Sequence, residues 1–196
     1  MKTLALLLAL WALPSMADIR IDGDALIYDG PTSHASDAEA ISALLGVHAE
    51  VRRIVLSGEF GVFRQALDVA RVVDDFGLDT EVRGTCTEGC LYILAAGKTR
   101  TLEKGGLLHL RRIVVSADAI SKQFDHLQAS YGWKNEFAQA VFMYDRAQND
   151  MRDALSFLLD HGVTLDFALQ VFDMPRQDFW TPTREELVAG GVVGAQ

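Results

Sequence analysis

The residues whose types and spacing could do chemistry begin in the stretch "GTCTEGC", residues 84–90. Cys86 and Cys90 lie four residues apart, and Glu88 lies midway between them. The apolar run "LYILAAG" follows at once, which predicts that this stretch opens a buried helix. At helical spacing the two cysteine Cα atoms would lie roughly 6 Å apart, near the upper limit for a disulfide. The sequence therefore permits a disulfide here, and equally permits two buried free thiols.

A histidine could work with these groups. His109 lies near the end of the predicted strand "GGLLHL", at residues 105–110. The sequence contains five histidines, and none has a second set of ligands at the spacing that a zinc site requires. His161, for example, precedes Gly162 near a predicted helix end, where a cation suits the helix dipole. We therefore expect no metal ion, and no motif in the sequence indicates an organic cofactor.

Alternating strands and helices must position these groups. Residues 19–30 alternate in polarity and turn like a β-hairpin, and "SDAE" at residues 36–39 predicts a helix start with a capping box. Strand–helix–strand–helix–strand alternation follows; its predicted elements are residues 52–58, 62–77, 78–84, 90–97 and 105–110. Such alternation predicts an α/β fold with parallel strands and right-handed crossovers.

The remainder of the chain is predicted to be helical. Residues 119–132 and 135–162 form two long amphipathic segments, which we expect to pair as a helical hairpin. Four aromatic residues crowd this hairpin, and we expect most of them in the core, with any surplus at a subunit interface: Trp133, Phe137, Phe142 and Tyr144. A shorter helix at 164–172 and a second capping box, "TREE" at 183–186, complete the pattern.

The amino terminus has the pattern of a secretory signal peptide. Lys2 precedes an apolar run that ends at Pro14, and the small residues Ser15 and Ala17 occupy the two positions that determine cleavage after Ala17. The apolar run is shorter than the ~20 residues that a membrane span needs. We therefore expect a signal peptide at residues 1–17, a single domain at residues 18–196, and a periplasmic or secreted protein. The net charge of −9 disfavours nucleic acid and anionic lipid as partners.

The order of these elements resembles the proteolytic subunit of the Clp protease. It resembles more closely the exported Clp-protease-like proteins of the same superfamily, which also contains the crotonases. The resemblance extends from about Ile19 to Val193. It implies a spiral of parallel βαβ units followed by a C-terminal helical region.

The resemblance also assigns positions to a catalytic site. Exported members of the family often carry Cys-x-Ser-Ala-Cys at the turn where this chain has residues 86–90, so Glu88 takes the place of the nucleophilic serine. The catalytic histidine of the family matches His109. The "QDFWTPTREELVAGGVV" stretch places Asp178 at the position of the catalytic aspartate.

The oxyanion-binding positions of the family match three further residues. The family has a Gly-Gly loop after a strand, where this chain has Glu59 and Phe60, and its second donor is the residue after the serine, here Gly89. Phe60 adds bulk where the family has only hydrogen. A carboxylate at position 88 is a poor acyl-transfer nucleophile, and its charge opposes that of a developing oxyanion. We expect Glu88 and His109 to form a charge-assisted hydrogen bond instead.

These departures imply an exported, catalytically degenerate relative, a pseudo-protease with a binding or assembly role. The alternative is an active hydrolase, a peptidase or esterase, that uses His109 with Glu88 or Thr87. A third reading makes Cys86 and Cys90 a redox switch, which needs an accessible thiol. The family's assemblies imply a homo-oligomer or another exported protein as partner, with no membrane span in the mature chain.

Overall fold

The computed structural model describes residues 18–30, 36–61, 63–111, 116–173 and 179–195. The predicted signal peptide and Asp178 lie outside these residues. The helices are α1 (Asp37–Val47), α2 (Phe63–Phe76), α3 (Cys90–Ala95), α4 (Ala117–Tyr131), α5 (Glu136–Asp160), α6 (Leu165–Asp173) and α7 (Arg184–Ala189). The strands are β1 (Asp18–Asp22), β2 (Ala25–Asp29), β3 (Arg53–Gly58), β4 (Asp79–Thr87), β5 (Arg100–Leu102), β6 (Leu107–Arg111) and β7 (Phe179–Trp180).

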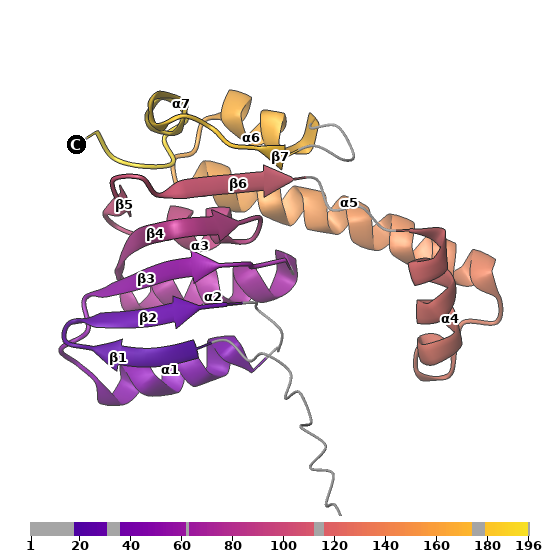
Figure 1. The fold of residues 1–196 in the computed structure, drawn as a ribbon. Coiled ribbons are helices and arrows are strands. Elements are labelled where there is room, and N and C mark those ends of the chain that lie inside the picture. Colours follow the sequence, from indigo (N-terminus) through magenta and orange to yellow (C-terminus); the bar gives the residue numbers. More distant parts are fainter. Residues whose placement is uncertain (1–17, 31–35, 62, 112–115, 174–178, 196) are drawn as a thin grey trace, which may run out of the picture.

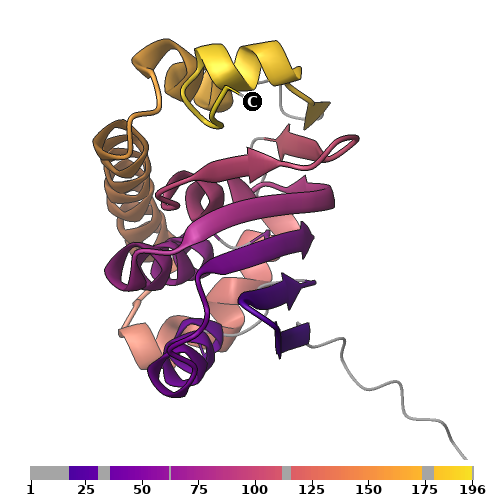
Figure 2. The ribbon, with the colours of Figure 1, turned by 90° about the vertical axis from the view of Figure 1, so that its left-hand side faces the viewer.

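The strands form one sheet in the order β1-β2-β3-β4-β6-β7, with β5 also paired to β4. The pairs β2–β3, β3–β4, β4–β5 and β4–β6 are parallel, whereas β1–β2 and β6–β7 are antiparallel. Helices α1, α2, α3 and α5 lie on one face of this sheet (Figures 1 and 2). The structure thus confirms the predicted hairpin and the predicted parallel α/β alternation.

The central strand β4 determines where the candidate site residues lie. It is nine residues long because it pairs on one side with two strands in succession. Thr80–Val82 pair with β5, and Thr85–Thr87 pair with β6. Cys86 and Thr87 were predicted to lie in the turn, but they belong to β4, and the turn begins at Glu88.

The main core lies between the sheet and its helices. Its largest fully buried side chains include Tyr28, Leu56, Phe60, Leu91 and Leu94. Burial of apolar side chains on this scale is the dominant favourable contribution to the stability of a domain of this size. Helix α3 is buried at every position, as its uniformly apolar sequence predicted.

Of the two predicted capping boxes, the structure forms only the second. Thr183 and Glu186 form both reciprocal hydrogen bonds at the start of α7, which confirms the second box. Ser36 precedes α1, but its side chain makes no capping hydrogen bond, so the first box is wrong. Ser36 has helical backbone angles, whereas a capping residue is usually extended, and its hydroxyl is therefore not aimed at the helix amides.

The predicted helical hairpin is formed by α4 and α5. Trp133 and Phe142 pack together within it, and the Gln139 side-chain amide donates to the Ile120 carbonyl oxygen at 3.0 Å. The first part of α5 extends beyond the sheet together with α4 (Figure 1). The expectation of a mainly buried aromatic cluster is only half correct, because Phe137 and Tyr144 lie on the surface, 81% and 67% exposed.

We predict that Gly97→Ala destabilises the protein by at least about 2 kcal/mol, because the added Cβ would overlap the Thr80 side chain. Thr80 is buried and its hydroxyl donates to the Leu94 carbonyl oxygen at 2.8 Å, so it has no room to move away. The matched control is Gly46→Ala in α1, where no atom lies within 4 Å of the new Cβ. That change should stabilise by roughly 0.5–1 kcal/mol. Urea unfolding measures both, and equal effects would contradict the packing described here.

Candidate functional site

The candidate site is built around the turn that joins β4 to α3. Glu88 has a φ of 42°, the only positive φ of a non-glycine residue in the described part of the chain. Backbone strain of this kind is often found at functional sites. The Glu88 N–H donates to the His109 carbonyl oxygen at 2.9 Å, and the Gly89 N–H donates to the Phe60 carbonyl oxygen at 2.7 Å. The turn is therefore held from both sides, by β6 and by the chain after β3.

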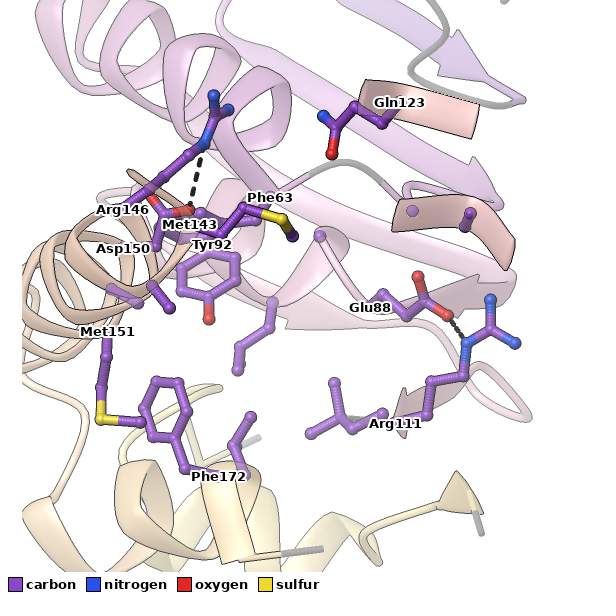
Figure 3. Close-up of a pocket in the computed structure, with 18 of the residues that line it drawn as sticks. Phe63, Glu88, Tyr92, Arg111, Gln123, Met143, Arg146, Asp150, Met151 and Phe172 are labelled. Atoms are coloured by element: carbon purple, nitrogen blue, oxygen red, sulfur yellow. Dashed lines mark hydrogen bonds and ion pairs between the residues drawn. The ribbon is translucent and has the colours of Figure 1, made fainter. Parts of the chain in front are cut away.

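The predicted side-chain pair of Glu88 with His109 is wrong. The Glu88 carboxylate instead accepts from the Nε–H of Arg111, two residues beyond His109 on β6 (Figure 3). His109 Nδ1 lies 2.5 Å from the hydroxyl of Thr181. The positive φ at Glu88 turns its side chain toward the end of β6, and Thr181, just after β7, contacts the imidazole. The two groups are neighbours through their backbones only.

The predicted oxyanion positions make other contacts as well. Phe60 is fully buried, and its ring packs edge-on against Tyr28 with 4.9 Å between the ring centres. Its N–H lies 3.3 Å from the Thr87 hydroxyl oxygen, to which it donates. The Gly89 N–H is occupied by the Phe60 carbonyl, and a side chain at Gly89 would overlap that carbonyl. Glu59, the third position, is exposed to solvent.

The two cysteines form a disulfide. Cys86, near the end of β4, is bonded to Cys90, the first residue of α3, with 6.0 Å between their Cα atoms. Both residues are fully buried. The structure thus resolves the two alternatives left open by the sequence in favour of the disulfide. An accessible redox thiol does not match this arrangement.

A pocket of about 690 Å³ opens beside the turn (Figure 3). This volume lies within the range of small-molecule sites, ~300–1,000 Å³. The wall is mainly apolar and comes from α2, α3, α4, α5 and α6 as well as β6. Its residues are Gly61, Phe63, Glu88, Gly89, Leu91, Tyr92, Leu110, Arg111, Ala119, Gln123, Phe142, Met143, Arg146, Ala147, Asp150, Met151, Ala154, Val171 and Phe172.

Tyr92 supplies a buried polar group to this pocket. The residue is 7% exposed, and its ring packs edge-on against Phe63. Figure 3 shows its hydroxyl directed into the cavity, and this hydroxyl has no hydrogen-bond partner in the described part of the chain. Burial raises the pKa of Tyr92, so the phenol is neutral at ordinary pH. An occupant of the pocket could therefore form a hydrogen bond with it.

The charged side chains of the pocket are paired with one another. Glu88 forms its ion pair with Arg111, and Asp150 lies 3.8 Å from Arg146. Asp150 also forms an ion pair with Arg64 of α2. Because each carboxylate in the pocket wall is already paired with an arginine, an occupant needs no charge of its own.

Sequence reasoning missed several of these residues. Arg111 could have been found, because residues two apart on a strand point to the same side and His109 had been identified. Tyr92 carries the only side-chain oxygen within the apolar "LYILAA" run, which was an available signal. The sequence contains no signal for Arg146 and Asp150, because only the packing of α5 brings them to the pocket.

No group of three or more potential metal-ligating side chains occurs in the described residues. His48 Nδ1 lies 2.8 Å from Glu50, and His161 caps α5 with Nδ1 2.7 Å from the Phe157 carbonyl oxygen. The helices in the described ranges also include none with the length and apolarity needed to cross a bilayer.

Comparison with known proteins identifies the type of fold. No protein-family model and no curated protein sequence matches the chain. Among solved structures, it is similar to a protein from Streptomyces coelicolor A3(2) assigned as an enoyl-CoA hydratase, with 12% identity and a TM-score of 0.50. The alignment covers 99% of this chain and 71% of that one. The chain has a crotonase-like fold.

This fold agrees with the α/β spiral expected from the sequence. An identity of 12% supports the architecture and does not transfer an activity. The crotonase-like sheet places the β4–α3 turn beside the pocket described above. The finer resemblance to Clp-protease-like proteins stays a prediction, as does the assignment of Glu88, His109 and Asp178 to family site positions.

We predict that the stability of the protein falls above about pH 10, the ordinary pKa of tyrosine. Burial keeps Tyr92 protonated in the folded state to a higher pH than in the unfolded chain. Its contribution is therefore complete below pH ~10 and is lost as the pH rises beyond it, by up to ~1.4 kcal/mol per pH unit. Urea unfolding between pH 9 and 11 measures this slope. Tyr92→Phe should reduce it, whereas Tyr144→Phe, at an exposed position, should not.

Proposed function

We propose that this chain is an exported, catalytically degenerate protein on a crotonase-like, Clp-protease-like scaffold, which binds an apolar ligand and does not hydrolyse it. One observation carries the proposal. The Gly89 N–H, which the family resemblance makes an oxyanion donor, is bonded to the Phe60 carbonyl oxygen at 2.7 Å. Acyl transfer needs such donors free, because loss of one typically costs about 3 kcal/mol of transition-state stabilisation.

The nucleophile position supports the same conclusion. Glu88 has no hydroxyl, and its carboxylate is held by Arg111. His109, the candidate base, contacts Thr181 and does not line the pocket. A serine-type hydrolase requires a nucleophile, a base and an oxyanion site in mutual contact. In this chain these three groups have other partners: Arg111 for Glu88, Thr181 for His109, and the Phe60 carbonyl oxygen for the Gly89 N–H.

The alternative of an active hydrolase has no specific observation in its favour. Thr87 is its remaining hydroxyl candidate, but that oxygen accepts from the Phe60 N–H at 3.3 Å. Thr87 and His109 are directly paired in register on β4 and β6, yet the imidazole of His109 contacts Thr181.

The pocket supports binding as the retained function. Its wall is apolar except for paired charges, the Gln123 amide and the Tyr92 hydroxyl. Such a cavity suits a neutral, largely apolar molecule that carries one hydrogen-bonding group. The two wall methionines, Met143 and Met151, can adapt to ligands of different shape.

Export is part of the proposal and rests on the sequence of residues 1–17. The Cys86–Cys90 disulfide is consistent with it, because structural disulfides persist mainly in oxidising compartments. The periplasm or the exterior is thus the proposed location. A homo-oligomer is the proposed assembly.

We expect no hydrolysis of a broad panel of peptides, esters and thioesters by the purified protein. Glu88→Ser should also fail to gain activity, because a new hydroxyl does not release the Gly89 N–H. His109→Ala is the control for a residual general base. Turnover by the wild-type protein that disappears in His109→Ala would overturn the degenerate-site proposal.

We expect the protein to bind N-phenyl-1-naphthylamine, a neutral apolar fluorophore, with a saturable increase in fluorescence. Ala119→Trp places an indole in the pocket from α4 and should raise the dissociation constant at least about tenfold. Ala129→Trp is the matched control, since Ala129 is exposed on the same helix and does not line the pocket. Equal binding by both variants would refute the pocket as the ligand site.

A further inference from the structure

The hydroxyl of Tyr92 differs from that of the other buried tyrosine in the described residues. Tyr28 is fully buried, and its hydroxyl donates to the Asp37 carboxylate at 3.0 Å. Tyr92 is 7% exposed, and its hydroxyl is directed into the cavity, where the described part of the chain offers it no partner (Figure 3). Buried polar groups are almost always paired, as Tyr28 is. The exception at Tyr92 indicates that its partner is a molecule in the pocket.

The Tyr92 phenol acts toward such a molecule as a hydrogen-bond donor. Burial raises its pKa, so the phenol keeps its proton at ordinary pH. A ligand that lacks an acceptor displaces water from the cavity and leaves the hydroxyl unpaired, which costs free energy. A ligand with a carbonyl oxygen at this place takes over the hydrogen bond of the displaced water. The pocket therefore favours a ligand that carries an acceptor over a plain hydrocarbon.

A neutral acceptor suits this pocket better than a carboxylate. The arginines of the wall, Arg111 and Arg146, already lie beside Glu88 and Asp150. A further carboxylate would enter a mainly apolar cavity without a free cation to pair with, and burial of an unpaired charge is costly. A carbonyl oxygen needs only the one hydrogen bond that Tyr92 can donate.

Aromatic rings make up much of the remaining wall. Phe63 of α2, Phe142 of α5 and Phe172 of α6 line the cavity, and each is partly buried. Phe63 packs edge-on against Tyr92, with 5.0 Å between the ring centres. Edge-on and offset ring pairs gain free energy beyond that of the area they bury, and the thioethers of the two wall methionines also pack favourably against rings. An aromatic ligand makes these contacts, whereas an aliphatic chain does not.

We propose that the pocket selects aromatic carbonyl compounds, with the Tyr92 hydroxyl donating a hydrogen bond to the carbonyl oxygen. Tyr92 is then the specificity-determining residue of the site. The inference rests on the binding function proposed above and names the class of ligand. It includes no bond-making step, because the hydroxyl keeps its proton.

Benzophenone and diphenylmethane test the hydrogen bond, because they share both phenyl rings and differ only in a carbonyl against a methylene group. Equilibrium dialysis measures their dissociation constants. Tyr92→Phe should weaken benzophenone binding about threefold to tenfold, the net contribution of one hydrogen bond, and should not weaken diphenylmethane binding. Tyr144→Phe is the matched control, exposed and outside the pocket wall, and should change neither constant. An equal effect of Tyr92→Phe on both ligands would overturn the proposal.

The infrared band of the bound carbonyl reports the same hydrogen bond in the wild-type protein. With isotopically labelled benzophenone, the band should lie at lower frequency in the complex than in dry hexane, because hydrogen bonding weakens the C=O bond. In Tyr92→Phe the band should return toward its position in hexane, while urea unfolding shows that this variant is folded. A wild-type complex whose band stays at the hexane position contradicts the proposal.

Dicyclohexyl ketone tests the aromatic part, because it keeps the carbonyl and replaces both phenyl rings with saturated rings. It should bind at least about threefold more weakly than benzophenone. Equal or tighter binding would refute the aromatic class. If Ala119→Trp weakens binding of the fluorophore but Tyr92→Phe does not distinguish the two matched ligands, this inference fails and the proposed binding function stands. If none of the probes binds, both fail.

Discussion

The closure of the turn between β4 and α3 is the constraint on which the rest of the site depends. Gly89 lies so close to Phe60 and Ala66 that no side chain fits there, and its N–H is bonded to the Phe60 carbonyl. Glu88 is bonded through its own N–H to β6, at the cost of a positive φ. The Cys86–Cys90 disulfide links the strand to the helix across the same turn. Together these contacts fix α3, and α3 supplies the inner wall of the pocket.

In the function proposed above, this closure separates binding from catalysis. Hydrogen bonds that make the turn rigid use the same backbone donor that an acyl-transfer site would leave free for an oxyanion. The carboxylate of Glu88 is neutralised by Arg111 at the pocket wall, and Asp150 is likewise paired with arginines. What remains available in the pocket wall is apolar surface, the Gln123 amide and the buried Tyr92 phenol. This is the basis on which we propose a site that binds and does not hydrolyse.

Helix α5 combines three environments along one continuous helix. Its C-terminal half contributes Ala154 and Leu158 to the core, its middle contributes Arg146 and Asp150 to the pocket, and its first half exposes Phe137, Val141 and Tyr144. These roles fall on different sides of the helix because 3.6 residues complete each turn.

The sequence by itself determined the elements whose information is local. The hairpin, the strand–helix alternation and the Thr183 capping box follow from periodicity and short-range hydrogen bonding, and the structure confirms them. The tertiary structure alone decided the partners of Glu88 and His109, the choice of disulfide over thiols, and the position of Tyr92 in the pocket wall. It also revealed β5, which at three residues is too short to leave a pattern. These features depend on which residues of distant segments become neighbours, and on a backbone angle at Glu88 that residue type alone does not specify.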